Sequence, residues 1–320
     1  MTERAEVPPS DTVVGAAVAG RPAAGAASAL AAVGRRLPLH IAVVGIMIIW
    51  SVPTIALLVS SFRTPQAIAS SGWWNAIREP LDFTLDNYET VLEKRGMGRA
   101  FVNSLIITVP STCISIMVAA WAAYAFAWMR FPGRNTLFLI VVALLVVPLQ
   151  MTLIPVLRLY TNITIEADMP IIGGRIFGTS SFAGMWLAHT AYGLPFAVYL
   201  LRNFFGGLPR DLLESAFLDG ASDLRVFLRI VLPLSMPAIA ALAIFQFLWI
   251  WNDLLVALVF LGDPRLFPMT VQIQSLVSSF GSNYQVLTAA AFVSMALPLA
   301  IFFALQRYFV QGVLAGAVKG

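Results

Sequence analysis

Several polar and aromatic residues lie inside long apolar stretches of the chain, where such side chains are uncommon. They are Trp249, Trp251, Asn252, Asp253, Gln150 and His189. Amide and carboxylate groups hydrogen-bond to hydroxyls and indole rings stack on apolar faces, so this set has the chemistry that a sugar would need. The alternative is that these groups bond to the backbone of neighbouring helices or to a partner subunit.

No catalytic or metal-binding set accompanies these residues. His40 and His189 are far apart in sequence and have no carboxylates at the spacing of a metal site. The chain lacks the GxxxxGKS/T phosphate loop, so it cannot bind ATP in that way. Cys113 is its single cysteine, which excludes an intramolecular disulfide and a cysteine-based metal site. We therefore expect no enzyme activity, no metal and no cofactor held by this chain.

The composition indicates a membrane protein. Hydrophobic residues make up 59% of the 320 residues and charged residues 11%, and the mean hydropathy is +0.84. A soluble domain carries roughly 25% charged residues. Apolar stretches of about 20 residues are long enough to cross the hydrocarbon core of a bilayer. The chain has six, which predict an all-α integral membrane protein with six transmembrane helices at about 39–62, 101–129, 136–160, 182–205, 234–261 and 287–310.

Basic residues in the loops predict the orientation, because cytoplasmic loops carry an excess of Lys and Arg. Arg35 and Arg36 beside the first span, and Arg130 and Arg134 in a tight turn, give the strongest local signals. They favour cytoplasmic N- and C-termini. The net charge of +4 is modest and its basic residues are scattered, so we expect no nucleic-acid partner.

This orientation divides the chain into four expected regions. A flexible cytoplasmic N-terminal tail covers residues 1–37, and residues 38–100 hold the first membrane helix and a long extracytoplasmic loop. The core membrane domain covers 101–310, and a cytoplasmic C-terminal tail covers 311–320. Residues 161–181 and 262–286 are further outer segments, the first of them expected to be irregular.

A charged segment at 208–233 separates the fourth and fifth spans. Its pattern predicts two short amphipathic helices with a turn at Gly220, an N-cap at Ser222 and an end at Pro233. The expected apolar stripes are Leu212, Leu213, Ala216 and Phe217 in the first helix, and Val226, Phe227, Ile230 and Val231 in the second. The pair could lie on lipid headgroups or dock into a cytoplasmic partner. Acidic Glu214 and Asp219 fit headgroups poorly, which favours a protein partner.

The sequences ESAFLDGA and IVLPL in this segment resemble the EAA loop of the membrane subunits of ABC importers. Ser215 departs from the alanine of that motif. Four further stretches, FVNSLIITVPST, AAYAFAWMRFPGR, WNDLLVALVFL and QRYFVQGVLAGAVKG, are similar to the second permease subunit of maltose-type carbohydrate importers. Two more, VVPLQMTLIPVLRLY and WLAHTAYGLPFAVYLLRNFF, are similar to α-glucoside permeases within that class. The resemblance covers about residues 40–320 and implies the type I ABC importer permease fold.

The resemblance also implies partners and roles. The expected partners are two ATPase subunits that bind ATP–Mg, a second homologous permease subunit, an extracytoplasmic sugar-binding protein that meets 262–286, and membrane lipids of a bacterial inner or plasma membrane. The residues implied to couple the chain to the ATPase are Glu214, Ser215, Ala216, Phe217, Asp219, Gly220 and Ala221. In the C-terminal tail, Gln311, Gly316 and Lys319 would also reach the ATPase.

The expected function is therefore that of a permease subunit that forms half of the pathway for a di- or oligosaccharide, an α-glucoside such as maltose or trehalose. One alternative is a stand-alone secondary sugar carrier, which would often show matching halves and more than six spans. Another is an integral membrane enzyme, which would need a convergent acid–base or metal cluster. The sequence shows neither feature. In the resembled family the sugar site lies mainly in the other permease subunit.

Overall fold

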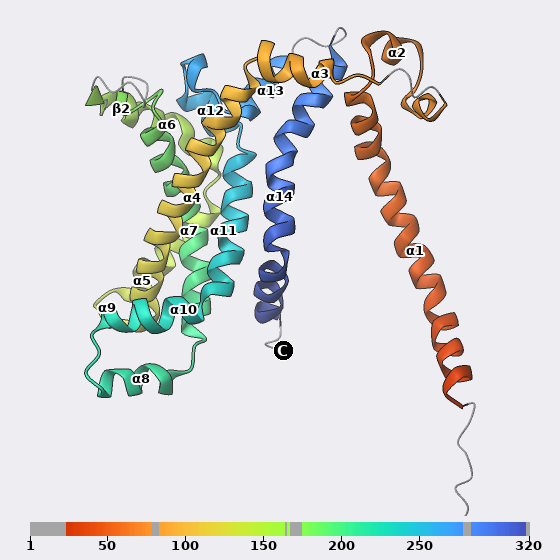
Figure 1. Ribbon diagram of the computed structural model, residues 1–320. Helices are drawn as coiled ribbons and strands as arrows, with labels where there is room; N and C mark the ends of the chain where they lie inside the picture. Colours follow the sequence, from red (N-terminus) through yellow and green to blue (C-terminus); the bar gives the residue numbers. More distant parts are fainter. Residues whose placement is uncertain (1–23, 79–82, 164, 167–174, 278–282, 318–320) are drawn as a thin grey trace, which may run out of the picture. The chain divides into compact units, whose positions relative to one another are not determined.

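A computed structural model describes residues 24–78, 83–163, 165–166, 175–277 and 283–317 of the chain (Figure 1). It divides into two compact units, 1–55 and 56–320, with helix α1 (Ala24–Ser61) continuing from the first into the second. Helix α1 begins inside the expected N-terminal tail. The remaining elements, in chain order, are α2 (Pro65–Ser70), η1 (Trp73–Ile77), α3 (Asp86–Glu89), η3 (Thr90–Lys94), α4 (Met97–Trp128), α5 (Arg134–Ala143), η4 (Leu144–Val146), α6 (Leu149–Asn162), β1 (Ile165–Glu166), β2 (Arg175–Phe177), α7 (Phe182–Gly206), α8 (Arg210–Leu218), α9 (Asp223–Val226), η5 (Phe227–Val231), α10 (Leu232–Leu234), α11 (Met236–Trp251), α12 (Leu255–Phe260), η6 (Pro264–Leu266), α13 (Met269–Val277) and α14 (Tyr284–Ala317).

Long apolar helices dominate the described residues, as the composition predicts. Three segments, Leu37–Ser61, Met97–Trp128 and Tyr284–Ala304, are long and apolar enough to cross a membrane singly. Two bent helix pairs raise the number of candidate spans to as many as five. Helix α7 coincides with the fourth expected span and has 25 residues, but it is not among these candidates. The expected number of six spans is therefore not confirmed.

The third expected span is not one straight helix. The segments Arg134–Val146 and Leu149–Asn162 meet at an angle of 105°. The backbone at Val147 is extended, with φ −73° and ψ 117°, because it precedes Pro148, and a proline disfavours the helical conformation in the residue before it.

The fifth expected span is also broken. Helix α11 stops at Trp251, and α12 begins only at Leu255. At the other end of α11, Asp223–Leu234 and Met236–Trp251 meet at 74°. That bend lies at Ser235, which has φ −95° and ψ 4°, so Pro233 stays inside α10 and does not end the preceding helix as expected.

The described residues include one small β-sheet. Strands β1 and β2 pair antiparallel, with Ile165 opposite Phe177 and Glu166 opposite Arg175. These strands lie in the outer segment 161–181, which was expected to be irregular. The fold of the described part is therefore helical apart from this two-stranded pair.

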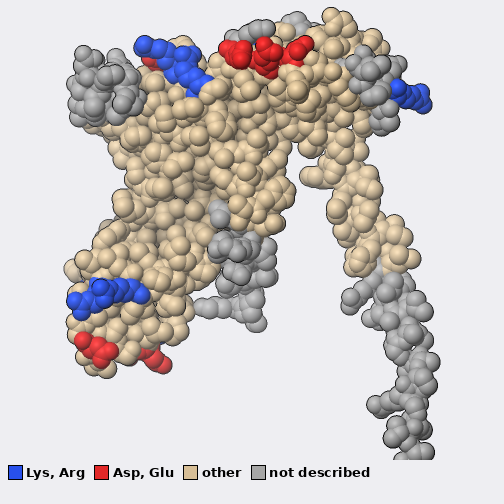
Figure 2. Space-filling view, viewed as in Figure 1, with Lys and Arg blue, Asp and Glu red and all other residues tan. Residues whose placement is uncertain are grey.

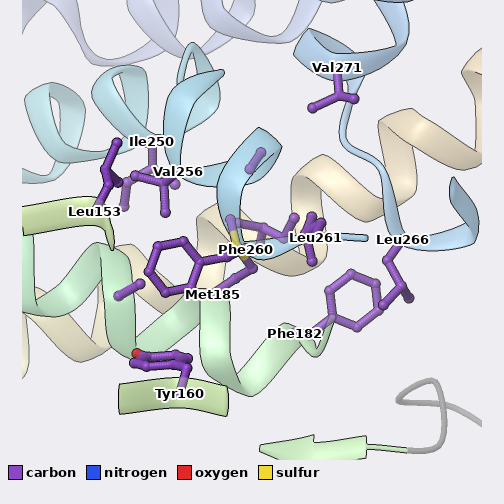
Figure 3. Close-up of a cluster of buried hydrophobic side chains, with 13 residues drawn as sticks. Leu153, Tyr160, Phe182, Met185, Ile250, Val256, Phe260, Leu261, Leu266 and Val271 are labelled. Atoms are coloured by element: carbon purple, nitrogen blue, oxygen red, sulfur yellow. The ribbon is translucent and has the colours of Figure 1, made fainter. Parts of the chain in front are cut away.

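Two of the three clusters of buried side chains in the described part of the 56–320 unit bear on the candidate site. One joins α6, α7 and α12 around Tyr160, Phe182, Met185 and Phe260; in Figure 3, Met185 and Phe260 lie above Tyr160, and Phe182 lies beside Leu266. The other joins α4 and α7 to the 208–233 segment and is rich in alanine. Small residues let membrane helices approach closely, so this alanine-rich contact holds α4 firmly against α7. In Figure 1, α8 and α9 lie at one end of this unit, and β2, α12 and α13 lie at the other.

The start of α7 has no room for a side chain at Gly184. Ser181 caps the helix by accepting a hydrogen bond from the Gly184 N–H at 3.0 Å, and its hydroxyl donates to the Gly178 carbonyl at 2.9 Å. A Cβ at Gly184 would overlap that carbonyl oxygen, which belongs to the backbone and cannot rotate away.

Replacing Gly184 by alanine is therefore expected to destabilise the protein by about 1–3 kcal/mol, the usual cost of overpacking. Thermal unfolding in detergent measures the effect. Gly206→Ala at the other end of α7 is the matched control, because a Cβ there meets no atom within 4 Å. Equal stability of the two variants would contradict the steric argument.

Candidate functional site

The 208–233 segment folds as the two short helices predicted from its pattern. Helix α8 ends at Leu218, and the chain turns at Gly220 with φ +77°, a left-handed conformation that glycine adopts without steric cost. Ser222 takes the extended N-cap conformation before α9, but its side chain makes no capping hydrogen bond. Asp223 occupies the first turn, where the helix dipole favours a carboxylate.

The second of these helices is fixed to the membrane bundle. Val226, Phe227 and Val231 are buried, as the apolar stripe predicts. The Phe227 ring lies 4.8 Å from the ring of Trp121 and 5.1 Å from that of Tyr124, both on α4. The Tyr124 hydroxyl also donates a hydrogen bond to Asp223 Oδ1 at 3.2 Å. A displacement of α9 and η5 must therefore act directly on α4.

The first helix presents most of its side chains outward. Of its apolar stripe, Leu213 alone is buried and Ala216 is half-buried, whereas Leu212 and Phe217 are exposed. Leu218 is 88% exposed. Large apolar side chains exposed together usually mark a contact surface.

Charges surround this exposed apolar surface. Asp211, Glu214 and Asp219 are exposed on or next to α8, and Arg225 and Arg229 are exposed on α9 and η5. Figure 2 shows an acidic and a basic group of atoms side by side at this end of the unit. Ser215 and Ala221 belong to the same turn: the Ser215 hydroxyl donates to the Leu212 carbonyl at 3.1 Å, and the Ala221 N–H donates to the Ala216 carbonyl at 3.0 Å.

Three of the candidate residues at membrane depth come together. His189 Nε2 on α7 lies 3.8 Å from Asp253 Oδ2, and the His189 ring meets the Trp249 ring edge-on at 6.0 Å. The Asp253 carboxylate also accepts hydrogen bonds from the N–H groups of Val256 and Ala257 at 3.4 and 3.2 Å. Asp253 thus stabilises the start of α12 at the break after α11.

The other candidates make structural contacts. The Trp251 indole donates to the Ser294 carbonyl at 3.1 Å, and the Asn252 amide donates to the Leu248 carbonyl at 2.7 Å. These are the bonds to helix backbone that formed the alternative interpretation of the sequence. Gln150 is exposed near the start of α6 and is not joined to the His189 group. Among the described residues, no group of three or more His, Cys, Asp or Glu could hold a metal ion.

A pocket of about 310 Å³ lies between α7 and α11. This pocket is called the α7–α11 pocket below. It is lined by Tyr192, Gly193, Phe196, Phe245, Gln246 and Trp249. Sequence reasoning had singled out Trp249 but not the other aromatic residues. Their spacing offered a signal, because Tyr192 and Phe196 on α7, and Phe245 and Trp249 on α11, are each four residues apart and share a helix face.

Comparisons with known proteins identify the family. Residues 91–315 match the family described as binding-protein-dependent transport system inner membrane component. The chain belongs to this family. It is the non-catalytic membrane subunit, or permease, of an ABC importer, and it lies as a multi-pass protein in the cell membrane.

Two curated relatives match most of the permease. This permease is 55% identical over 289 residues to the osmoprotective compounds uptake permease protein GgtD of Synechocystis sp., and the match covers 89% of this chain and 93% of the relative. It is 42% identical over 386 residues to the alpha-glucoside transport system permease protein AglG of Rhizobium meliloti, covering 89% and 99%.

A solved structure shares the permease fold. A chain of a bacterial ABC transporter involved in the import of the acidic polysaccharide alginate matches with a TM-score of 0.72 at 18% identity. The match covers 87% of this permease and 98% of that chain. This likeness confirms the ABC importer permease fold, although it does not fix the number of spans.

The segment 262–277 of the permease, expected to be an outer segment, is held against α4. The Asn103 amide donates to the carbonyls of Arg265 and Phe267 at 2.8 and 3.1 Å, and the Met269 N–H donates to Ser104 Oγ at 2.9 Å. Asp263 is half-exposed and accepts hydrogen bonds from the Arg265 side chain, which lower the pKa of its carboxyl group below the usual value. Residues 262–277 therefore form a defined surface against α4, whereas 278–282 lie outside the described residues.

The C-terminal residues expected to meet the ATPase are only partly described. The backbone of Gln311 and Gly316 continues helix α14 of the permease, and their side-chain surroundings lie outside the described residues, as does Lys319. Their expected contact with an ATPase remains a prediction.

Proposed function

We propose that this permease forms half of the translocation pathway of an ATP-driven importer of a di- or oligosaccharide, specifically an α-glucoside such as maltose or trehalose. The observation that carries this proposal is the 42% identity to a named α-glucoside permease along 99% of that relative. Relatives at 30% and 29% identity are named as arabinooligosaccharide permeases, which supports a sugar as the substrate class. The name of the relative at 55% identity makes an osmoprotective compound the second candidate.

The 208–233 segment is proposed to couple the permease to a separate ATPase. Glu214 and the exposed Phe217 and Leu218 would enter a cleft of that subunit, and Gly220 would set the angle between the two helices. Ser215, Ala216, Asp219 and Ala221 complete the turn that positions them. Because Phe227 packs on α4, a movement of α8 would be transmitted to the transmembrane helices. The exposure of apolar side chains beside acidic ones supports a protein partner over a lipid surface.

The complete importer is proposed to contain two ATPase subunits, a second homologous permease and an extracytoplasmic sugar-binding protein. One solved relative of this fold is a bacterial alginate ABC transporter in complex with an alginate pentasaccharide-bound periplasmic protein. The outer surface around 262–277 is the part of this chain proposed to meet the binding protein. Both termini are proposed to be cytoplasmic, which places Gln311, Gly316 and Lys319 on the ATPase side. The comparisons offer no support for a stand-alone secondary carrier.

Uptake by the reconstituted importer tests this function. With ATP inside the vesicles and the binding protein outside, radiolabelled maltose or trehalose is expected to accumulate, and unlabelled sugar of the same kind is expected to compete. Glycine betaine serves as the competing osmoprotective compound. Accumulation of sugar by the permease alone, without ATPase or ATP, would contradict the proposal, as would competition by glycine betaine and not by either sugar.

A further inference from the structure

The α7–α11 pocket combines three kinds of surface that a sugar ring requires: aromatic faces, a carboxamide and a phenol. We propose that this pocket binds one pyranose ring of the transported substrate, so that this permease subunit contacts the sugar itself. The inference rests on the proposed function and extends it to a specific site.

The lining suits the two chemistries of a pyranose. The C–H faces of the ring are apolar and stack on aromatic side chains, which Phe196, Phe245 and Trp249 supply. The hydroxyls at its edge need hydrogen-bonding partners, which the Gln246 amide and the Tyr192 hydroxyl can provide. Its volume of about 310 Å³ lies at the lower limit of small-molecule pockets. The pocket therefore holds one ring and not a whole oligosaccharide.

The pocket lies at the depth where a transported ligand must pass. Gly193 is close to the middle of the 25-residue helix α7, so the pocket is far from both ends of that helix. In secondary transporters the substrate site lies near the bilayer midplane, and an importer subunit that lines a pathway must also let its ligand pass this depth. A lipid chain at this depth has no group that could hydrogen-bond to an amide. A glutamine buried in the membrane is energetically costly unless it has a polar partner. The presence of Gln246 thus favours a polyhydroxyl ligand over lipid.

The Gln246 side chain makes only a weak hydrogen bond within the described residues, so its amide can bond to a ligand. Gln246 is only 4% exposed, and the distance from its Nε2 to Ser115 Oγ is 3.5 Å, which is the outer limit of a hydrogen bond. Gly193 makes the space for this amide, because a Cβ at position 193 would overlap Gln246 Nε2. Gly193 is therefore a positioning residue for Gln246. The Trp249 ring also makes an edge-on contact with the His189 ring.

The inference is tested with the complete reconstituted importer and with radiolabelled maltose and trehalose as probes. The measured quantity is the amount of sugar taken up for each ATP hydrolysed. Trp249→Ala is expected to lower sugar uptake per ATP by roughly three- to tenfold, the range that the loss of one aromatic stacking contact predicts. Stimulation of ATP hydrolysis by the binding protein should persist, because α8 is untouched. Trp249→Phe should retain most of the uptake, since it keeps an aromatic face. Gly193→Ala should lower uptake in the same way as Trp249→Ala, because it displaces the Gln246 amide.

Phe303→Ala on α14 is the matched control, because Phe303 is 63% exposed and lies outside the pocket. Equal uptake per ATP by Trp249→Ala and Phe303→Ala would overturn the inference. Loss of the second permease from purified Trp249→Ala complexes would also overturn it, because the pocket would then be a subunit contact. A wild-type importer that takes up neither sugar would instead refute the α-glucoside function itself, so the two failures are distinguishable.

Discussion

Replacing Glu214 by lysine is expected to abolish sugar uptake by the assembled importer, with a decrease of roughly 100-fold. Glu214 is exposed on α8 beside Phe217 and Leu218, where the proposed ATPase contact forms. A reversed charge facing a basic partner removes one favourable contact and adds a repulsive one. ATP hydrolysis should then no longer respond to the binding protein, in contrast to the behaviour expected of the pocket variants. Uptake and ATP hydrolysis measured on the same vesicles check both effects.

Asp211→Lys is the matched control for Glu214→Lys. It makes the same change of charge on the same exposed helix, one turn nearer the N-terminus, outside the ESAFLDGA motif. We expect its uptake to stay close to that of the wild type. Full uptake by Glu214→Lys would contradict the coupling assignment, and equal loss in both variants would show that the net charge of α8 matters and not the position of Glu214.

Replacing Phe227 by alanine is expected to disconnect the coupling segment from the transmembrane bundle. Phe227 is 1% exposed and packs on the rings of Trp121 and Tyr124, so its removal leaves a cavity between η5 and α4. Truncation of a buried phenylalanine usually costs about 3–5 kcal/mol. Thermal unfolding of the purified complex should show this loss. Uptake should fall further than stability alone explains, because movement of α8 would no longer reach α4.

Leu228→Ala provides the comparison for Phe227→Ala, because Leu228 is the next residue along the chain and is 49% exposed. It should change stability and uptake little. If Phe227→Ala unfolds in detergent, Phe227→Leu offers a milder test, since it keeps an apolar side chain while removing the ring contacts. Normal coupling in Phe227→Leu and Phe227→Ala alike would show that the signal does not pass through this residue.

The sequence predicted the structure best where the pattern lies within one short, continuous segment. The two helices of 208–233 and the turn at Gly220 follow from local apolar spacing and from the freedom of glycine at positive φ, and the structure confirms them. The motif around Glu214 indicated the correct family for the same reason, because its residues are contiguous. The long helices α1, α4 and α14 also follow from the length of their apolar stretches.

Bends were less predictable because hydropathy does not report backbone direction. The apolar stretches at 136–160 and 234–261 are continuous in composition, yet the chain bends at Pro148, at Ser235 and after Trp251. The positions of prolines in a sequence give candidate bends only, since Pro110 and Pro195 remain inside α4 and α7. Whether the neighbouring helices satisfy the freed carbonyl groups decides between a bend and a continuous helix.

The amino-acid sequence by itself determined that this is a helical membrane protein of the importer family and located its charged segment at 208–233, because length, composition and short motifs are local properties. The tertiary structure alone decided that Phe227 is buried while Phe217 is exposed, although both are apolar residues of the same segment. It also decided that Tyr192 and Phe196 meet Phe245 and Trp249 around one pocket. These distinctions depend on which helix packs against which, and such contacts join residues that are distant in the sequence.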